Sequence, residues 1–100
     1  MGSSIYKLFL FKPLDPWYRL DEPELTQLNR KFDDAVNEFK AKRVVLCNSS
    51  WSNQQWPYFG VEEFPDLISL QKHSEKLMEL QDPRYFENWT IIGSKMDSIE

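Results

Sequence analysis

The chain has one cysteine, Cys47, among its 100 residues. This excludes an intramolecular disulfide and a cysteine-based metal cluster, because each needs at least two thiols. Long apolar runs are also lacking, and "LFLF" at residues 8–11 is far shorter than the roughly 20 residues that span a bilayer. The start of the chain shows no signal-peptide pattern. These absences predict a cytoplasmic protein with no membrane partner.

Basic residues and histidine are scarce as well. Lys and Arg total 12 against 16 Asp and Glu, which gives a net charge of −4 at pH 7 and a pI near 5.0. Nucleic-acid binding needs clustered basic residues that displace counterions, so no nucleic-acid partner is expected. The only histidine is His73, and there is no zinc motif, phosphate loop or dinucleotide fingerprint. The sequence therefore predicts neither a bound metal nor a cofactor.

Apolar residues, at 41%, and aromatic residues, at 15%, are abundant enough to pack one domain over residues 1–100. Residue spacing predicts strands at 4–12, 43–51, 56–64 and 89–95, with helices at 22–40 and 67–81. Asp21 with Glu24 forms a capping box for the first helix, and Asp66 caps the second. The proline-rich segment before Asp21 is expected to be irregular, with no helix.

The order strand, helix, strand, strand, helix, strand is the split βαβ arrangement of the ferredoxin-like α+β fold. Right-handed crossovers place both helices on one face of a four-stranded antiparallel sheet. The first strand is apolar on both faces, with Leu8 and Leu10 opposite Phe9 and Phe11. Because the helices cover only one sheet face, the other face needs a second cover. The sequence therefore predicts a homodimer in which two sheets pack together into an α/β barrel.

Three segments carry a family resemblance: the opening strand running into "KPLDPWYRL", the "EEFPDL" entry to the second helix, and the closing "DPRYFENWTIIGS". The chain resembles the dimeric α/β-barrel superfamily and, more narrowly, the darcynin-like proteins, over nearly its whole length. The resemblance implies the barrel-forming dimer. Relatives with known activity include monooxygenases, cyclases, isomerases and heme-degrading oxygenases. The heme-degrading relatives have an asparagine on the first strand, where this chain has Ser4, Tyr6, Leu8 and Leu10, so heme degradation is not expected.

His73 is the first candidate site residue, because it is the only side chain that titrates near neutral pH when unperturbed. It lies at the margin of the second helix's apolar stripe, which comprises Leu67, Leu70, Ser74, Leu77 and Met78. The stretch "LQKHSEKLMELQDP" is similar to barrel relatives that have a histidine on this helix. A histidine there suits a general acid or base, or a metal-ion or heme ligand. The alternative is a partly exposed histidine that only forms hydrogen bonds.

Aromatic and amide side chains form the other candidates. Trp51 and Trp56 are expected as pocket walls, with Asn48 and Tyr58 as placed polar groups; alternatively the rings pack the dimer seam. Strand alternation puts Trp56 and Tyr58 on one face.

The segment after the first strand adds a third group. Arg19 is expected to bind a substrate carboxylate through its guanidinium group, and Tyr6 and Trp17 are expected at the mouth of the cavity. Alternatively, Trp17 fills the end of the core. Glu62 and Glu63 point to opposite faces, so only one of them could serve as a base.

These residues predict a cofactor-independent enzyme of the cyclase, isomerase or dehydratase type that acts on a hydrophobic, polyketide-like or aromatic small molecule. The catalytic residues would be His73, Tyr58 and Asn48, and the substrate contacts Trp51, Trp56, Tyr6, Trp17 and Arg19. Two alternatives stay open. One is a non-catalytic dimeric module that binds a small ligand or a partner protein, and the other is a cofactor-free monooxygenase.

Overall fold

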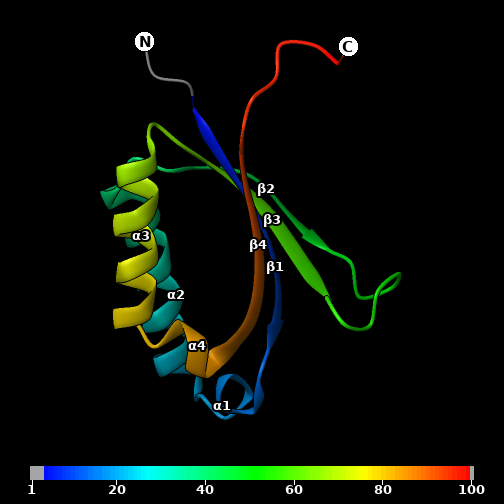
Figure 1. Cartoon of the computed structure of the whole chain (residues 1–100). Helices are drawn as coiled ribbons and strands as arrows, with labels where there is room; N and C mark the ends of the chain where they lie inside the picture. Colours follow the sequence, from blue (N-terminus) through cyan, green and yellow to red (C-terminus); the bar gives the residue numbers. More distant parts are fainter. Residues whose placement is uncertain (1–3, 100) are drawn as a thin grey trace.

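The computed structural model describes residues 4–99, which form one curved sheet with helices beside it (Figure 1). The elements follow in this order: β1 (Ile5–Pro13), α1 (Asp15–Tyr18), α2 (Glu22–Glu38), β2 (Lys42–Asn48), β3 (Tyr58–Phe64), α3 (Leu67–Glu79), α4 (Asp82–Tyr85) and β4 (Phe86–Ser94). No helix in this described part of the chain has both the length and the apolar character needed to cross a membrane.

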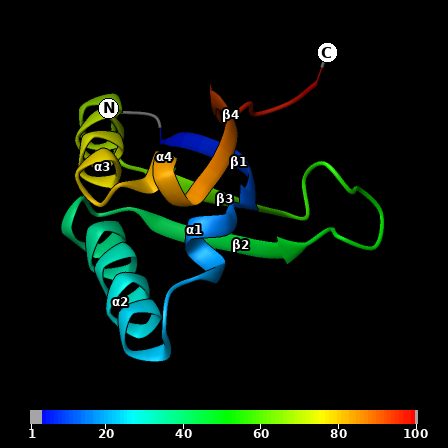
Figure 2. The same ribbon diagram turned by 90° about the horizontal axis from the view of Figure 1, so that it is seen from below.

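The sheet has the strand order β2-β3-β1-β4, and every neighbouring pair is antiparallel. Helices α2 and α3 both lie on one face of it (Figures 1 and 2). The predicted ferredoxin-like α+β fold is therefore confirmed. The capping box is also present, since Glu24 N donates to Asp21 Oδ1 at 2.9 Å and Asp21 N donates to Glu24 Oε1 at 3.3 Å. Asp66 likewise caps α3, accepting from Ser69 N at 2.7 Å.

Two one-turn helices, α1 and α4, were not predicted. Each begins with an Asp-Pro pair, "DPWY" and "DPRY". Proline fits the first turn of a helix because its fixed φ is already helical and its missing N–H needs no partner there. The expectation of an irregular segment before Asp21 is therefore wrong. The two turns meet, since Leu14 N donates to Tyr85 O at 2.7 Å and the rings of Trp17 and Tyr85 lie 6.1 Å apart.

The strands predicted at 43–51 and 56–64 pair as an antiparallel hairpin, but both are shorter than expected. Strand β2 ends at Asn48 because the Asn48 Oδ1 accepts hydrogen bonds from Ser50 N at 2.9 Å and Ser50 Oγ at 2.6 Å, which turns the chain. Strand β3 begins at Tyr58, directly after Pro57. Trp56 thus precedes the strand, and the prediction that alternation places it on one face with Tyr58 does not hold.

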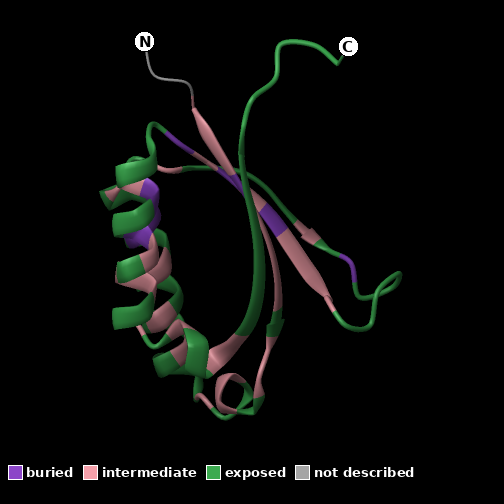
Figure 3. Ribbon diagram, viewed as in Figure 1, coloured by how far each residue is buried: buried purple, intermediate pink, exposed green. Residues whose placement is uncertain are grey.

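The buried core lies at one end of the helix layer, where α2 ends and α3 begins (Figure 3). Its apolar members are Ala35, Val36, Phe64 and Leu70. The stripe predicted for α3 is partly wrong, because Leu67 is 60% exposed and Met78 is 68% exposed, whereas His73 is only 2% exposed. The buried face of α3 is rotated toward His73, which lies against the Phe64 ring at a centroid distance of 5.2 Å.

Candidate functional site

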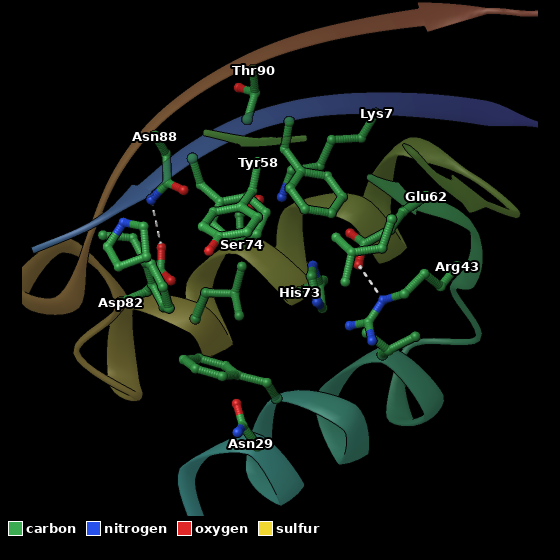
Figure 4. Close-up of a pocket in the computed structure, with 18 of the residues that line it drawn as sticks. Lys7, Asn29, Arg43, Tyr58, Glu62, His73, Ser74, Asp82, Asn88 and Thr90 are labelled. Carbon is green, nitrogen blue, oxygen red and sulfur yellow. Dashed lines mark hydrogen bonds and ion pairs between the residues drawn. The ribbon is translucent and has the colours of Figure 1, made fainter. Parts of the chain in front are cut away.

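A cavity of about 520 Å³ separates the rest of the helix layer from the sheet. This volume is within the range of about 300–1,000 Å³ that is typical of small-molecule sites. Its wall is mainly aromatic and aliphatic: Phe9, Phe11, Pro13, Trp17, Phe32, Val36, Leu46, Tyr58, Leu77, Met78 and Phe86. Polar side chains also reach it: Lys7, Tyr18, Asn29, Asp33, Arg43, Glu62, His73, Ser74, Asp82, Asn88 and Thr90 (Figure 4).

The sheet floor of this cavity is made by the odd-numbered residues of β1 and their cross-strand partners. Phe9 pairs with Gly60 on β3 and Thr90 on β4, and Phe11 pairs with Tyr58. The Phe9 ring occupies the space that a side chain at Gly60 would take, since a β-carbon there would collide with the Phe9 ring tip. The ring centroids of Phe9 and Phe11 lie 5.7 Å apart, and those of Phe11 and Tyr58 lie 5.4 Å apart. The floor is therefore a row of stacked rings.

His73 is the most deeply buried polar side chain on the cavity wall. The centroid of its ring lies 5.2 Å from that of Phe64 and 6.4 Å from that of Phe39. Neither Nδ1 nor Nε2 has a hydrogen-bond partner within the described part of the chain. Burial lowers the pKa of His73 from 6.5 to about 4, and the positive charges of Lys7 and Arg43 act in the same direction. His73 is therefore a neutral imidazole at pH 7.

A set of charged side chains lines the cavity near His73. Lys7 on β1 and Glu62 on β3 are register partners, and both are buried. Arg43 on β2 links two carboxylates, with Nη1 at 3.2 Å from Asp33 Oδ1 and Nε at 3.8 Å from Glu62 Oε2. Burial raises the pKa of the Glu62 carboxyl, although Lys7 and Arg43 oppose that shift. Burial also lowers the pKa of Lys7, which the Glu62 and Asp82 carboxylates oppose.

A second polar group lies where α4 meets β4. The Asn88 amide donates to Asp82 Oδ2 at 2.8 Å (Figure 4). Burial raises the pKa of the Asp82 carboxyl, while the hydrogen bond from Asn88 and the charge of Lys7 act in the opposite direction. The cavity therefore has an apolar middle with ionisable groups around it, which is the general pattern of a ligand site.

The structure brings together three of the residues predicted for the site: His73, Tyr58 and Trp17 all line the cavity. The other five lie outside it. Tyr6 alternates with Lys7 and so points to the opposite sheet face. Arg19 is exposed at the end of α1, and Asn48, Trp51 and Trp56 belong to the β2–β3 hairpin. Asn48 uses its side-chain oxygen to turn that hairpin.

Sequence reasoning missed Lys7 and Asp82. The signal for Lys7 was available, because it is the one charged residue among the apolar residues 5–11. The sequence alone does not distinguish Glu62 from Glu63, whereas the strand register places Glu62 on the cavity side of the sheet.

No group of three or more His, Cys, Asp or Glu suited to holding a metal ion is found among residues 4–99. A single histidine can instead bind a ligand that brings its own metal, as the proximal histidine of a heme protein does.

Comparison with known proteins gives matches only at the level of structure, since no family model and no curated protein matches the chain. A mutant chlorite dismutase from Candidatus Nitrospira defluvii is 17% identical, with a TM-score of 0.74, and 94% of this chain covers 41% of that one. A heme-binding protein from Thermus thermophilus is 16% identical with a TM-score of 0.77, and 97% of this chain covers 42% of it. The chain thus spans about two fifths of these proteins.

A shorter protein of unknown function, from Rhodopseudomonas palustris, is 13% identical with a TM-score of 0.65, and 98% of this chain covers 86% of it. At such identities the comparisons show a shared fold alone. That fold is the ferredoxin-like α+β fold. The resemblance to the dimeric α/β-barrel superfamily and to the darcynin-like proteins stays a prediction.

Proposed function

We propose that this protein binds heme or a closely related iron porphyrin, with His73 as the ligand to the iron. The observation that carries the proposal is the His73 imidazole, 2% exposed, on the wall of a 520 Å³ cavity with neither ring nitrogen hydrogen-bonded to residues 4–99. Burying an unpartnered polar group costs about 1–3 kcal/mol, so a role that uses the free nitrogen explains why it is there. The structural likeness to the heme-binding Thermus protein supports the choice of ligand.

The protonation state of His73 supports a ligand role over acid–base catalysis. A metal-bound histidine must be neutral. With a pKa of about 4, roughly one His73 in a thousand is protonated at pH 7. A general acid or base works best when its pKa is near the operating pH, so His73 is poorly suited to that task.

The other cavity residues fit a flat, mostly apolar ligand that carries carboxylates. The stacked rings of Phe9, Phe11 and Tyr58 offer an aromatic surface, and Lys7 and Arg43 supply positive charge on the wall. When bound, heme would supply a redox-active iron. The described residues would hold it, exclude water from one side and keep the His73 nitrogen unprotonated.

The decisive experiment is a hemin titration followed by visible absorbance, on protein whose polyhistidine tag has been removed so that His73 is the only histidine. We expect a saturable Soret band from the wild type and none of comparable affinity from His73→Ala. Added imidazole should restore the band in His73→Ala, because the free ligand fills the space of the lost ring. Tyr58→Phe is the matched control and should bind hemin as the wild type does. Equal hemin binding by His73→Ala would overturn the proposal.

A cofactor-independent acid–base enzyme is the second candidate, and one observation favours it. Glu62 and Asp82 both line the cavity with pKa values raised by burial, which is the direction a carboxyl acid or base needs near neutral pH. In such an enzyme the proton would move through Glu62 or Asp82, with Tyr58 orienting the substrate. Failure to bind hemin, together with binding of a polyketide-like or aromatic carbonyl compound, would favour it. A cofactor-free monooxygenase would instead consume oxygen.

The proposal also includes a homodimer formed by the sheet face opposite the helices. Its residues on β1, by alternation, are Tyr6, Leu8 and Leu10, next to Phe59 and Val61 on β3. The chain exposes 7367 Å², about 1,400 Å² more than a compact monomer of its mass would. A standard interface buries about 800 Å² per partner, so the excess is sufficient. Light scattering after size exclusion should give twice the 12.0 kDa chain mass.

A further inference from the structure

The β2–β3 loop, residues 49–57, projects beyond the sheet on the side away from the helices (Figures 1 and 2). It contributes to a radius of gyration of 14.5 Å, compared with the roughly 13 Å expected for a compact 100-residue domain. Near its tip the Trp51 side chain is 85% exposed. A lone exposed apolar residue is common on protein surfaces, but a tryptophan on an ordered, projecting loop is also the kind of side chain that anchors protein–protein contacts.

The loop is held in one shape by its own hydrogen bonds. Ser49 N donates to Pro57 O at 2.7 Å, and the Ser49 hydroxyl donates to Trp56 O at 2.6 Å, which joins the two ends of the loop. Trp56 N in turn donates to Asn53 Oδ1 at 2.9 Å. Because the loop is already ordered, a contact made by Trp51 would cost little further conformational entropy.

We propose that Trp51 docks onto a second copy of this chain and locks the dimer that the outer sheet faces form. The inference rests on the proposed dimer and adds the residue that dominates its affinity. The loop joins the end of β2 to the start of β3, and it projects on the side of the sheet away from the helices, where the outer face lies (Figures 1 and 2). In a two-fold dimer each loop reaches the partner, so Trp51 contributes twice.

The composition of the loop favours a second copy of this chain as the partner over a membrane surface or a nucleic acid. Residues 49–57 contain no charged side chain. Two symmetric copies can therefore approach one another without local charge repulsion. A loop that binds an anionic membrane surface or nucleic acid would need Lys or Arg beside the tryptophan. Exposed tryptophan is the side chain most enriched among residues that dominate protein–protein affinity.

Sedimentation velocity over a concentration series of the whole chain tests the inference. We expect Trp51→Ala to raise the dimer dissociation constant at least about 30-fold, which corresponds to ~2 kcal/mol. Trp51→Phe should keep most of the affinity because it retains an aromatic ring. Ile68→Ala is the matched control: Ile68 is 65% exposed on α3, away from the outer sheet face, and its loss should leave the constant unchanged.

The outcomes separate this inference from the dimer itself. A wild type that stays monomeric at every concentration overturns the dimer, and Trp51 docking with it. A dimeric wild type with an unchanged constant in Trp51→Ala overturns the docking alone. The docking is likewise overturned if Trp51→Ala loses only binding to anionic vesicles. At concentrations where both proteins are monomeric, melting curves should be the same for Trp51→Ala and the wild type, since the side chain is exposed in the single chain.

Discussion

Neighbouring side chains of β1 experience two very different environments. Lys7, Phe9 and Phe11 face the helices across a cavity whose wall also holds Glu62 and His73. The residues between them face away from the helices, among apolar partners on β3 and β4. The inner face accepts desolvated ionisable groups, which lower stability, whereas the middle of the outer face has none.

This difference indicates two separate tasks for one strand. Desolvated, incompletely paired charges are retained where they serve a ligand, since a well-packed apolar wall would be more stable. A continuous apolar face is instead typical of a surface that another protein covers. If so, a substitution on the cavity side should change ligand binding and leave the dimer intact, and a substitution on the outer face should do the reverse.

Replacing His73 by leucine should have opposite effects on ligand binding and on stability. The variant should show no hemin Soret band, because the iron ligand is gone. Its free energy of unfolding without ligand should rise by about 1–2 kcal/mol, since an unpartnered polar ring next to Phe64 is replaced by an apolar side chain. Urea unfolding of both proteins measures this. A less stable variant would show that His73 has a structural partner, and an unchanged oligomeric mass is the control.

Placing a charge on the outer face should separate the chains. Leu10 lies opposite Phe59 and Trp89, so Leu10→Asp would bury an unpaired carboxylate in each half of the dimer. We expect the dissociation constant to rise at least about 1,000-fold, as measured by sedimentation velocity. Ile68→Asp, on exposed α3, is the control. Hemin binding should survive in Leu10→Asp, and its loss would show that the two faces are not independent.

Acid should destabilise the protein through His73. Its folded-state pKa of about 4 lies below the ordinary 6.5, so between these values the unfolded chain binds more protons. Stability is therefore complete above pH 6.5 and falls as the pH drops toward 4, by up to about 3 kcal/mol. The raised pKa values of Glu62 and Asp82 act oppositely, since these carboxyls favour the folded state when protonated.

The His73→Leu variant isolates this contribution. Unfolding curves at several pH values should show a smaller acid loss in the variant than in the wild type. The carboxyls remain in both proteins, so the difference between the two pH slopes belongs to His73. Parallel slopes would mean that the pKa of His73 is close to its ordinary value.

Filling the space at Gly60 should narrow the cavity without unfolding the protein. A β-carbon there would collide with the tip of the Phe9 ring, so the ring, which lines the cavity, must shift. We expect Gly60→Ala to weaken hemin binding by about tenfold, or ~1.4 kcal/mol. Gly93→Ala is a matched control, because nothing lies within 4 Å of its β-carbon position. Equal affinities would place the ligand away from Phe9.

The sequence was sufficient for the architecture because periodicity, caps and turn residues act locally. Asp21 and Asp66 each cap the helix that they were predicted to cap. Predicting the site also requires the register between strands, which is set by pairing between residues far apart in the sequence. Whether Glu62 or Glu63 faces the cavity follows from its pairing with Lys7, and the rotation that buries His73 follows from packing against Phe64. Neither the glutamate that faces the cavity nor the burial of His73 can be predicted from the sequence of one segment alone.

Asn48 illustrates the same limit and gives the smallest expected effect. It was predicted to be a polar group of the pocket and a catalytic residue, but its side chain instead accepts two hydrogen bonds from Ser50. Asn48→Ala should therefore leave hemin affinity unchanged and lower stability by about 0.5–1.5 kcal/mol, the contribution of an ordinary hydrogen bond. Because these bonds shape the loop that carries Trp51, the dimer should weaken slightly too. A large loss of hemin affinity would return Asn48 to the site and put the independence of the two faces in question.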